Sequence, residues 1–285
     1  MTIASNCIPK ESFSSGISTF ALAQAVAQSI GPTAGVKLKD LIGYNTSYVV
    51  TACMMFLSML YVGLIVNIPD HNSGRLVLNF DNMIAKEVLL PAIISFLICV
   101  GFTSINSFFL IYAQERAIPK ASLYFTVYAI MLMASRPLVG KLTDRYGFVK
   151  VAIPAILMTS LSLFLIGQST RLWHLIAVAA VSSFGYGSVQ PSLQSMCMKA
   201  VPVNKRGSAS STNYVAVDSG TLIGPLICGY VAKVFGYTPL MWDIMAICVL
   251  LALVFTLVFS KQLTKIEDDF EKKAADSVLS TKTLY

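Results

Sequence analysis

The chain has 285 residues, of which only 12% are charged and 55% are apolar, and its mean hydropathy is +0.70. Soluble domains carry about 25% charged residues, so a soluble fold would have to bury nearly the whole chain. The net charge of +7 comes from residues set between long uncharged runs, which argues against a basic nucleic-acid-binding stripe. The composition predicts a membrane protein, because lipid itself solvates apolar side chains.

A helix needs about 20 predominantly apolar residues to cross the hydrocarbon core of a membrane. Runs that meet or nearly meet this requirement cover residues 14–36, 46–67, 88–113, 121–139, 151–170, 172–198, 210–232 and 238–260. The sequence therefore predicts an all-α membrane protein with about eight transmembrane helices. Arg136 lies near the end of its run, where a long side chain can extend to the interface.

Lysines and arginines are distributed unequally among the connections between these runs. Most of the 21 fall at the two ends of the chain and in alternate connections, such as those holding Lys86, Lys141, Lys150 and Lys205. Connections rich in lysine and arginine stay on the cytoplasmic side of a membrane. We expect a multi-pass protein of the plasma membrane with both termini in the cytoplasm.

The connection over residues 69–87 is long and polar, and it divides the predicted helices into two groups. We expect residues 1–68 to be the remnant of a first helical bundle and residues 69–87 to be a cytoplasmic linker. Residues 88–260 then form a six-helix bundle, and residues 261–285 form a charged cytoplasmic tail with the pattern of an amphipathic helix.

An internal repeat relates the first group to the second, because residues 8–44 and 201–237 align without a gap. Small residues recur every four positions in both copies, where they would let two membrane helices approach closely. The shared ridge and its Gly-Pro pair comprise Ala23, Ala27, Gly31, Pro32 and Gly35 in the first copy and Ala216, Gly220, Gly224, Pro225 and Cys228 in the second. The repeat predicts a plan of two six-helix halves, of which the second half is complete.

Two motifs carry a resemblance to a known family. The pattern G-x-L-x-D-R-x-G over residues 140–147 stands between two predicted helices, and it resembles the signature loop of the major facilitator superfamily. Residues 27–36 resemble the helix-five antiporter signature of that family, from which Ala27 and Val36 depart. The resemblance covers the whole chain as helices five to twelve of a twelve-helix transporter, with the end of helix four, and is closest to the drug–proton antiporters.

The resemblance implies a gating role for the cytoplasmic loop, which closes against the opposite half of the transporter in this family. The residues that carry this role are Arg136, Gly140, Asp144, Arg145 and Gly147. The two glycines permit tight turns and close helix approach. By the pseudo-symmetry of the two halves, the resemblance implies that this loop meets the start of the first helix, near residues 14–16. Asp144 can accept hydrogen bonds at a helix N-terminus, where the helix dipole favours an anion. The alternative is an ordinary basic turn.

Asp218 is the only charged residue well inside a predicted span, and we interpret it as the candidate for proton coupling. At 1.5 Å per residue it lies roughly 12–17 Å from the cytoplasmic end of its helix. A carboxylate at that depth is costly unless it is paired, hydrated or protonated. Ser211, Tyr214 and Thr221 share its face, whereas Gly220 faces away. The alternative is a structural carboxylate that binds neighbouring hydroxyls or an arginine.

Polar side chains in other spans are candidates for lining a central cavity. They are Asn106, Gln190, Gln194, Tyr214 and Thr221. The alternative for each is a hydrogen bond that joins two helices.

The resulting hypothesis is a secondary transporter that exports small amphipathic or cationic molecules in exchange for protons, by alternating access between two helical bundles. The alternative is a truncated family member that does not transport alone. Expected partners are the lipid bilayer, a small-molecule substrate, protons and, in the alternative, a separately encoded N-terminal part, with no nucleic acid. No H-E-x-x-H motif, P-loop or second deep aspartate is present, so we expect no enzyme activity, metal or cofactor.

Overall fold

The chain is helical throughout the part that the structure describes, which comprises residue 8, residues 12–63 and residues 84–282 of a computed structural model. The elements are α2 (Phe13–Gly63), η2 (Lys86–Val88), α4 (Leu89–Phe102), α5 (Ser104–Glu115), α6 (Leu123–Tyr146), α7 (Phe148–Gln168), α8 (Leu172–Lys199), η3 (Val203–Lys205), α9 (Arg206–Phe235), α10 (Pro239–Val258) and α11 (Ser260–Lys282). The predicted all-α membrane fold is confirmed. Most of the predicted linker lies outside the described residues.

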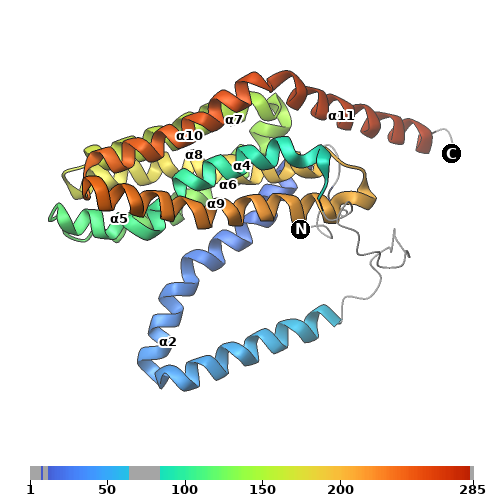
Figure 1. The fold of residues 1–285 in the computed structure, drawn as a ribbon. Helices are drawn as coiled ribbons and strands as arrows, with labels where there is room; N and C mark the ends of the chain where they lie inside the picture. The colour runs from blue at the N-terminus through green and yellow to red at the C-terminus, as the bar shows by residue number, and fades with distance from the viewer. Residues whose placement is uncertain (1–7, 9–11, 64–83, 283–285) are drawn as a thin grey trace.

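Seven helical segments among the described residues are long and apolar enough to cross a membrane. They are Leu38–Tyr61, Lys86–Glu115, Leu123–Tyr146, Phe148–Gln168, Leu172–Lys199, Val203–Phe235 and Pro239–Val258. A shorter apolar stretch, Phe13–Ala23, begins α2. Each predicted span overlaps one of these segments, and α4 and α6 to α10 form one bundle in Figure 1.

The helix α6 corrects one predicted boundary. The predicted span ended at residue 139, but α6 continues to Tyr146 and includes the motif that was expected to be a loop. The helix ends because Gly147 has φ 84°, a conformation that strongly favours glycine. The next helix, α7, begins at Phe148. Most of the signature motif therefore forms the last turns of a helix, and only its final glycine forms the turn.

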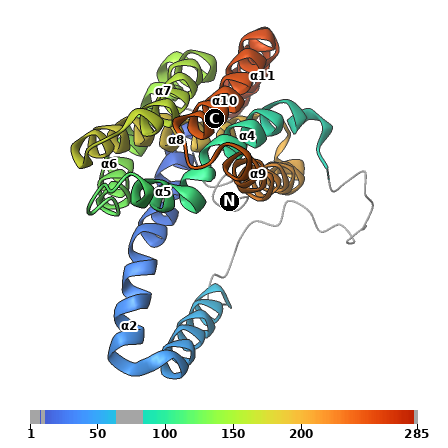
Figure 2. The ribbon, with the colours of Figure 1, turned by 60° about the vertical axis from the view of Figure 1, so that its left-hand side comes forward.

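The helix α2 holds the first two predicted spans on either side of a bend at Gly43, where φ is 75° and ψ is 170°. The part before the bend packs against α6 and α8. The helix leaves the bundle before it reaches the bend, and the part beyond the bend lies apart from the other helices, as Figures 1 and 2 show. The most apolar part of Leu38–Tyr61 is not buried by any other described residue, so its surface is available to lipid or to another polypeptide.

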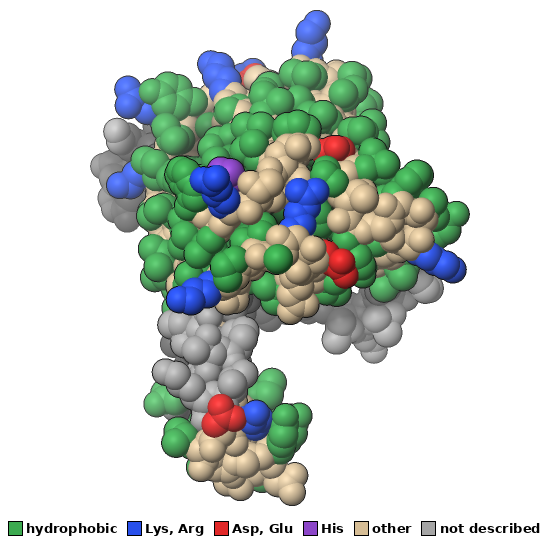
Figure 3. Space-filling view, turned by 90° about the vertical axis from the view of Figure 1, so that its left-hand side faces the viewer, with side chains coloured by type: hydrophobic (Ala, Val, Ile, Leu, Met, Phe, Trp, Pro, Cys, Tyr) green, Lys and Arg blue, Asp and Glu red, His purple; other side chains and the backbone are tan. Residues whose placement is uncertain are grey.

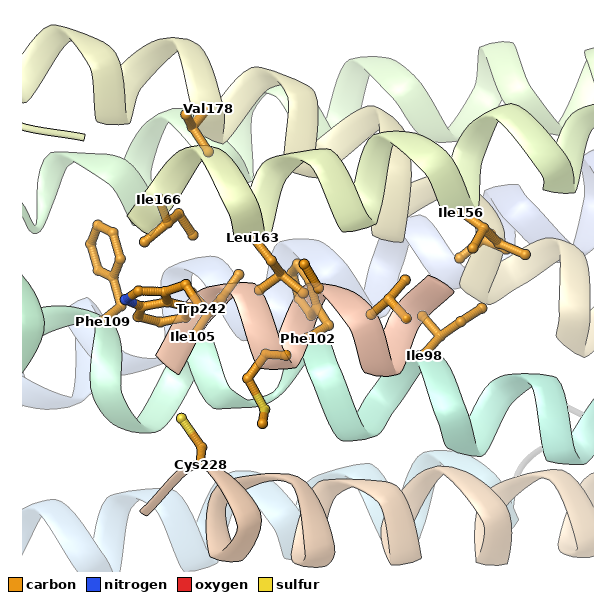
Figure 4. Packing of buried hydrophobic residues seen from close by; sticks show 14 of the residues in the cluster. Ile98, Phe102, Ile105, Phe109, Ile156, Leu163, Ile166, Val178, Cys228 and Trp242 are labelled. Atoms are coloured by element: carbon orange, nitrogen blue, oxygen red, sulfur yellow. The ribbon is translucent and has the colours of Figure 1, made fainter. Parts of the chain in front are cut away.

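The main core lies between the helices of the second group. Phe102, Ile105 and Phe109 pack there against Leu163 of α7 and Trp242 of α10, as Figure 4 shows. Tyr112 lies with its ring 5.5 Å from that of Trp242, in an edge-to-face arrangement, and donates a hydrogen bond to the carbonyl of Gly167 at 2.6 Å. Aromatic rings and branched side chains thus hold α4, α5, α7 and α10 together.

The helices α4 and α9 approach closely because α9 carries glycine residues where the two helices meet. A Cβ atom at Gly220 would lie 2.7 Å from the carbonyl oxygen of Phe96, and one at Gly224 would overlap the carbonyl oxygen of Val100. Cys228, one turn further along, is fully buried. The small-residue ridge of α9 therefore packs closely on α4, as its spacing predicts.

The lateral surface of the bundle is rich in exposed apolar side chains. They include Leu157, Leu161 and Phe164 on α7 and Leu222 and Leu226 on α9. Figure 3, a view onto the end that carries α5, shows hydrophobic side chains mixed with Lys, Arg, Asp and Glu side chains on that end. Monomeric soluble proteins rarely expose apolar patches of this extent. The lateral surface is therefore suited to contact with lipid.

Candidate functional site

A carboxylate of α6 binds the first turn of α2. The Asp144 Oδ1 atom accepts a hydrogen bond from the backbone N–H of Ser14 at 2.8 Å, and its Oδ2 atom accepts one from Ser15 at 2.7 Å. The first N–H groups of a helix have no partner within the helix and carry the positive end of its dipole. This is the contact that the sequence predicts for Asp144, and we call this part of the molecule the Asp144 end of the bundle.

Gly140 brings the two helices together one turn before Asp144. A Cβ atom at this position would lie 2.8 Å from the Cα atom of Ser15 and 2.9 Å from the Cβ atom of Ser18. Any larger residue would push α2 away from α6. Arg145 is exposed and stacks over the ring of Tyr146 at 5.2 Å, so it takes no part in this contact.

Arg136 does not lie in a loop, as the sequence suggested, because α6 continues for ten residues beyond it. Its side chain is only 8% exposed, and Nη1 donates a hydrogen bond to the backbone carbonyl of Ala21 on α2. The prediction failed because hydropathy falls after residue 139 although the helix does not end there. Arg136 is thus a buried cation between α2 and α6.

The tail helix α11 contributes a carboxylate that the sequence reasoning missed. Glu267 accepts hydrogen bonds from the backbone N–H of Phe148, at 3.0 Å and 2.8 Å to its two oxygens, and forms a 3.2 Å ion pair with Lys199. Both side chains of the pair are less than 10% exposed. Glu267 therefore joins α11 to the start of α7 and the end of α8.

A signal for this docking is present in the sequence. Leu263, Ile266, Glu267 and Phe270 follow the i, i+3, i+4, i+7 spacing of one helical face. Leu263 is fully buried, and the ring of Phe270 lies 5.3 Å from that of Phe13 at the start of α2. The predicted amphipathic tail is thus a packed element that touches both helical groups.

Replacing Glu267 by glutamine is expected to lower the free energy of unfolding by about 1–2 kcal/mol. The amide keeps an acceptor for Phe148 but loses the ion pair with Lys199. Thermal unfolding of the purified protein in detergent measures the change. Glu271→Gln, exposed on the same helix, is the control and should stay within about 0.5 kcal/mol. Equal losses in both variants would contradict a docking role for Glu267.

The polar stripe of α9 faces away from the packed ridge. Ser211, Tyr214, Asp218 and Thr221 are all exposed, whereas Gly220 and Gly224 are buried. Asp218 makes no hydrogen bond or ion pair with any described residue. The alternative role, a structural carboxylate that binds neighbouring hydroxyls or an arginine, therefore finds no partner in the described part of the chain.

The other cavity candidates do not form one group. Gln194 is buried, and its Nε2 atom donates to the Tyr214 hydroxyl at 3.2 Å. Gln190 is half-buried on the same helix, and Asn106 is exposed on α5. Thr221 donates to the backbone carbonyl of Val217 at 2.9 Å, so its hydroxyl is satisfied within α9. Only the Gln194–Tyr214 pair brings two of these candidates together.

The first copy of the small-residue ridge is only partly described. The side chains of Gly31 and Pro32 fall outside the described residues, although the backbone of α2 is helical there. Gly35 is exposed, and a Cβ atom on it would meet nothing within 4 Å. In the second copy, Pro225 follows the packed Gly224 inside α9 and is half-buried.

An aromatic surface is formed by rings from α4, α6 and α8. The rings of Phe102 and Tyr186 stack with centroids 3.7 Å apart, and Tyr128 lies 5.9 Å from Phe102. The Tyr186 hydroxyl lies 3.7 Å from the Cys99 sulfur. The sequence offers no signal for this group, because its members come from three helices at unrelated spacings.

Comparisons with known proteins agree with this architecture. The sequence profile described as Major Facilitator Superfamily matches residues 91–283. The multidrug resistance protein MdtG of Proteus mirabilis is 27% identical over 197 residues, which is 67% of this chain and 47% of MdtG. The vacuolar membrane amino acid uptake transporter fnx2 of Schizosaccharomyces pombe is 26% identical over 174 residues, 60% of this chain and 30% of fnx2. The chain thus spans less than half the length of these relatives.

Solved structures show the same fold. The human organic anion transporter MFSD10 superposes with a TM-score of 0.76 at 15% identity, covering 89% of this chain and 66% of MFSD10. The transporter FucP in its outward conformation gives a TM-score of 0.68 at 17% identity, over 90% of this chain and 70% of FucP. Because the family profile covers more than half of the sequence, the chain belongs to the Major Facilitator Superfamily.

Proposed function

We propose that the chain is a secondary active transporter of the plasma membrane that exports small molecules in exchange for protons, with both termini in the cytoplasm. The observation that carries the proposal is Asp218, a carboxylate deep within an apolar helix that has no partner in the described part of the chain. Its cost in that position falls when it binds a proton. A group that gains and loses a proton on a cavity surface is what proton coupling requires.

The Asp144 end supplies the second element of the proposal. Alternating access needs a contact between the two helical groups that forms on one side of the membrane and breaks in the opposite state. The bonds from Ser14 and Ser15 to Asp144 join α2 to α6 in this way. We infer that this contact closes the cytoplasmic side.

Relatives support a transport function with varied cargo. MdtG is named for multidrug resistance, MFSD10 for organic anions, and fnx2 for amino acid uptake. A structural neighbour, FucP, is described as a fucose:proton symporter. These names favour small molecules as the substrate class and agree with proton coupling.

Replacing Asp218 by asparagine is expected to abolish the dependence of transport on the proton gradient. Asparagine keeps the size of the side chain but cannot release a proton. The test measures efflux of a fluorescent drug from vesicles with and without an imposed pH gradient. Asp268→Asn, which removes an exposed carboxylate from α11, should leave the dependence intact. A gradient dependence that survives Asp218→Asn would remove Asp218 from the mechanism.

A chain that does not transport alone is the second candidate. The chain spans 47% of MdtG, and the apolar segment Leu38–Tyr61 is uncovered, so a separately encoded N-terminal part would find a surface there. The test compares this chain with a version joined to the first four helices of a relative. Equal transport by both forms would exclude this candidate.

A further inference from the structure

Arg136 is a buried cation that the proposed proton pathway does not use. No carboxylate among the described residues forms an ion pair with it. Its Nη1 atom donates to the Ala21 carbonyl, but its buried Nε atom has no hydrogen-bond partner in the described part of the chain. A charged side chain inside a membrane protein is costly when unpaired and commonly marks a functional site.

Two buried hydroxyls lie near this part of α6. Ser18 and Ser188 are each 1% exposed, and their Oγ atoms have no hydrogen-bond partner among the described residues. Ser18 is packed against the position of Gly140, one turn from Arg136. Together with the Nε atom of Arg136, these atoms are three buried polar groups that a ligand could satisfy.

The register of α6 and α8 places Ser188 about one helical turn from Arg136. Ser135 donates to the Ser183 carbonyl at 3.3 Å, and Thr143 lies 3.2 Å from Ser192 through their hydroxyls. Since the two helices run in the same direction, the part of α8 around Ser188 faces the part of α6 between these contacts. We call this junction of α2, α6 and α8 the Arg136 seam.

The Arg136 seam borders the aromatic surface described above. Tyr128 lies two turns before Arg136 on α6, Tyr186 lies two residues before Ser188 on α8, and Tyr186 stacks on Phe102. A guanidinium forms paired hydrogen bonds to a carboxylate, phosphonate or sulfonate group. Aromatic faces next to it offer apolar contact to the rest of such a molecule.

We propose that Arg136 and Ser188 bind the anionic group of the transported molecule, which is therefore an organic anion rather than the cation that the sequence suggested. The proposal rests on the alternating-access function above. When α2 withdraws from α6, Arg136 loses the Ala21 carbonyl and its donors become available to the anion. When α2 returns, the Ala21 carbonyl and Ser18 replace the anion, which is released toward the other side.

The test uses the whole chain in lipid nanodiscs and three probes that share one ring system. These are 2-naphthoate, neutral 2-naphthamide and the cation (2-naphthylmethyl)trimethylammonium. Equilibrium binding to the unmodified protein is expected to favour 2-naphthoate over 2-naphthamide by roughly tenfold or more. Arg136→Gln should remove this preference. Arg136→Lys should keep part of it, because lysine retains the charge without the planar fork.

Further variants keep the test decisive. Ser188→Ala should weaken 2-naphthoate binding several-fold and leave 2-naphthamide unaffected. Lys141→Gln, an exposed cation on the same helix, is the matched control and should bind all probes as the unmodified protein does. Thermal unfolding shows which variants are folded. If Arg136→Gln does not fold, then Arg136→Lys and Ser188→Ala carry the conclusion.

The outcomes separate this inference from the proposed function. Equal binding of the three probes, or a preference for 2-naphthoate that survives the folded Arg136 and Ser188 variants, would overturn the anion site. Preferential binding of the cation would also overturn it while leaving proton-driven transport intact. Arg136-dependent binding of 2-naphthoate by a chain without proton-driven transport would support the site and count against the proposed function.

Discussion

Replacing Asp144 by alanine is expected to open the Asp144 end of the bundle. The carboxylate accepts two short hydrogen bonds from backbone N–H groups of α2, and alanine leaves both without a partner. Hydrogen bonds to a charged group contribute about 1.5–3 kcal/mol each. Allowing for partial exposure and for water replacing the lost acceptor, we expect a net shift of about 2–3 kcal/mol, roughly a hundredfold change in the ratio of closed to open forms.

Distances between spin labels measure this shift directly. Labels at Ser12 and Lys141, both exposed, report the separation of α2 and α6 in the reconstituted protein. Asp144→Asn should give an intermediate population, because the amide keeps one acceptor without the charge. Asp268→Ala removes an exposed carboxylate on the same side and should leave the distances unchanged. A distance distribution unaltered by Asp144→Ala would show that the contact does not hold the two helices together.

Replacing Gly224 by valine is expected to produce the largest loss of stability among the changes considered. The added Cβ would overlap the carbonyl oxygen of Val100 and lie 2.8 Å from the Thr103 hydroxyl. A backbone carbonyl inside a helix cannot move aside as a flexible side chain can. We therefore expect α4 and α9 to separate, at a cost of about 3 kcal/mol or more.

Unfolding in sodium dodecyl sulfate, followed by circular dichroism, measures this loss. Gly207→Ala is the matched control, because Gly207 lies on the same helix and an added Cβ there meets nothing within 4 Å. That change should be neutral or slightly stabilising, since alanine favours the helix over glycine. A Gly224→Val protein as stable as the control would mean that α4 and α9 do not pack as described.

The features that the sequence predicts well are those that follow from local chemistry. Apolar runs long enough to cross a membrane identify the helices, because a chain in lipid must satisfy its backbone hydrogen bonds internally. The small-residue ridge of α9 packs on α4 because only small side chains allow that approach. The contact of Asp144 with the start of α2 is expected from the family resemblance and the pseudo-symmetry of the two halves, and it agrees with the complementarity of an acidic group and unpaired helix N–H groups.

The features that escaped prediction depend on contacts between distant segments. Hydropathy falls at Lys141, but nothing local shows that α6 continues to Tyr146. The burial of Arg136 follows from that continuation and from the position of α2. Glu267 lies in a charged tail, and its role is visible only once α7 and α8 present a free N–H and a lysine to it.

The Asp144 contact also bears on how the protein can change during evolution. The two donors are main-chain atoms of Ser14 and Ser15, so the bonds do not depend on which side chains stand there. Substitutions of Ser15 are then limited by size, through the close approach at Gly140, whereas the Ser14 hydroxyl also contacts the Ser195 hydroxyl at 3.0 Å. Substitutions of Asp144 are limited by the need for a carboxylate that accepts two hydrogen bonds. Saturation mutagenesis should therefore tolerate many small residues at position 15 and only an acidic one at position 144, an asymmetry between two surfaces that bind each other.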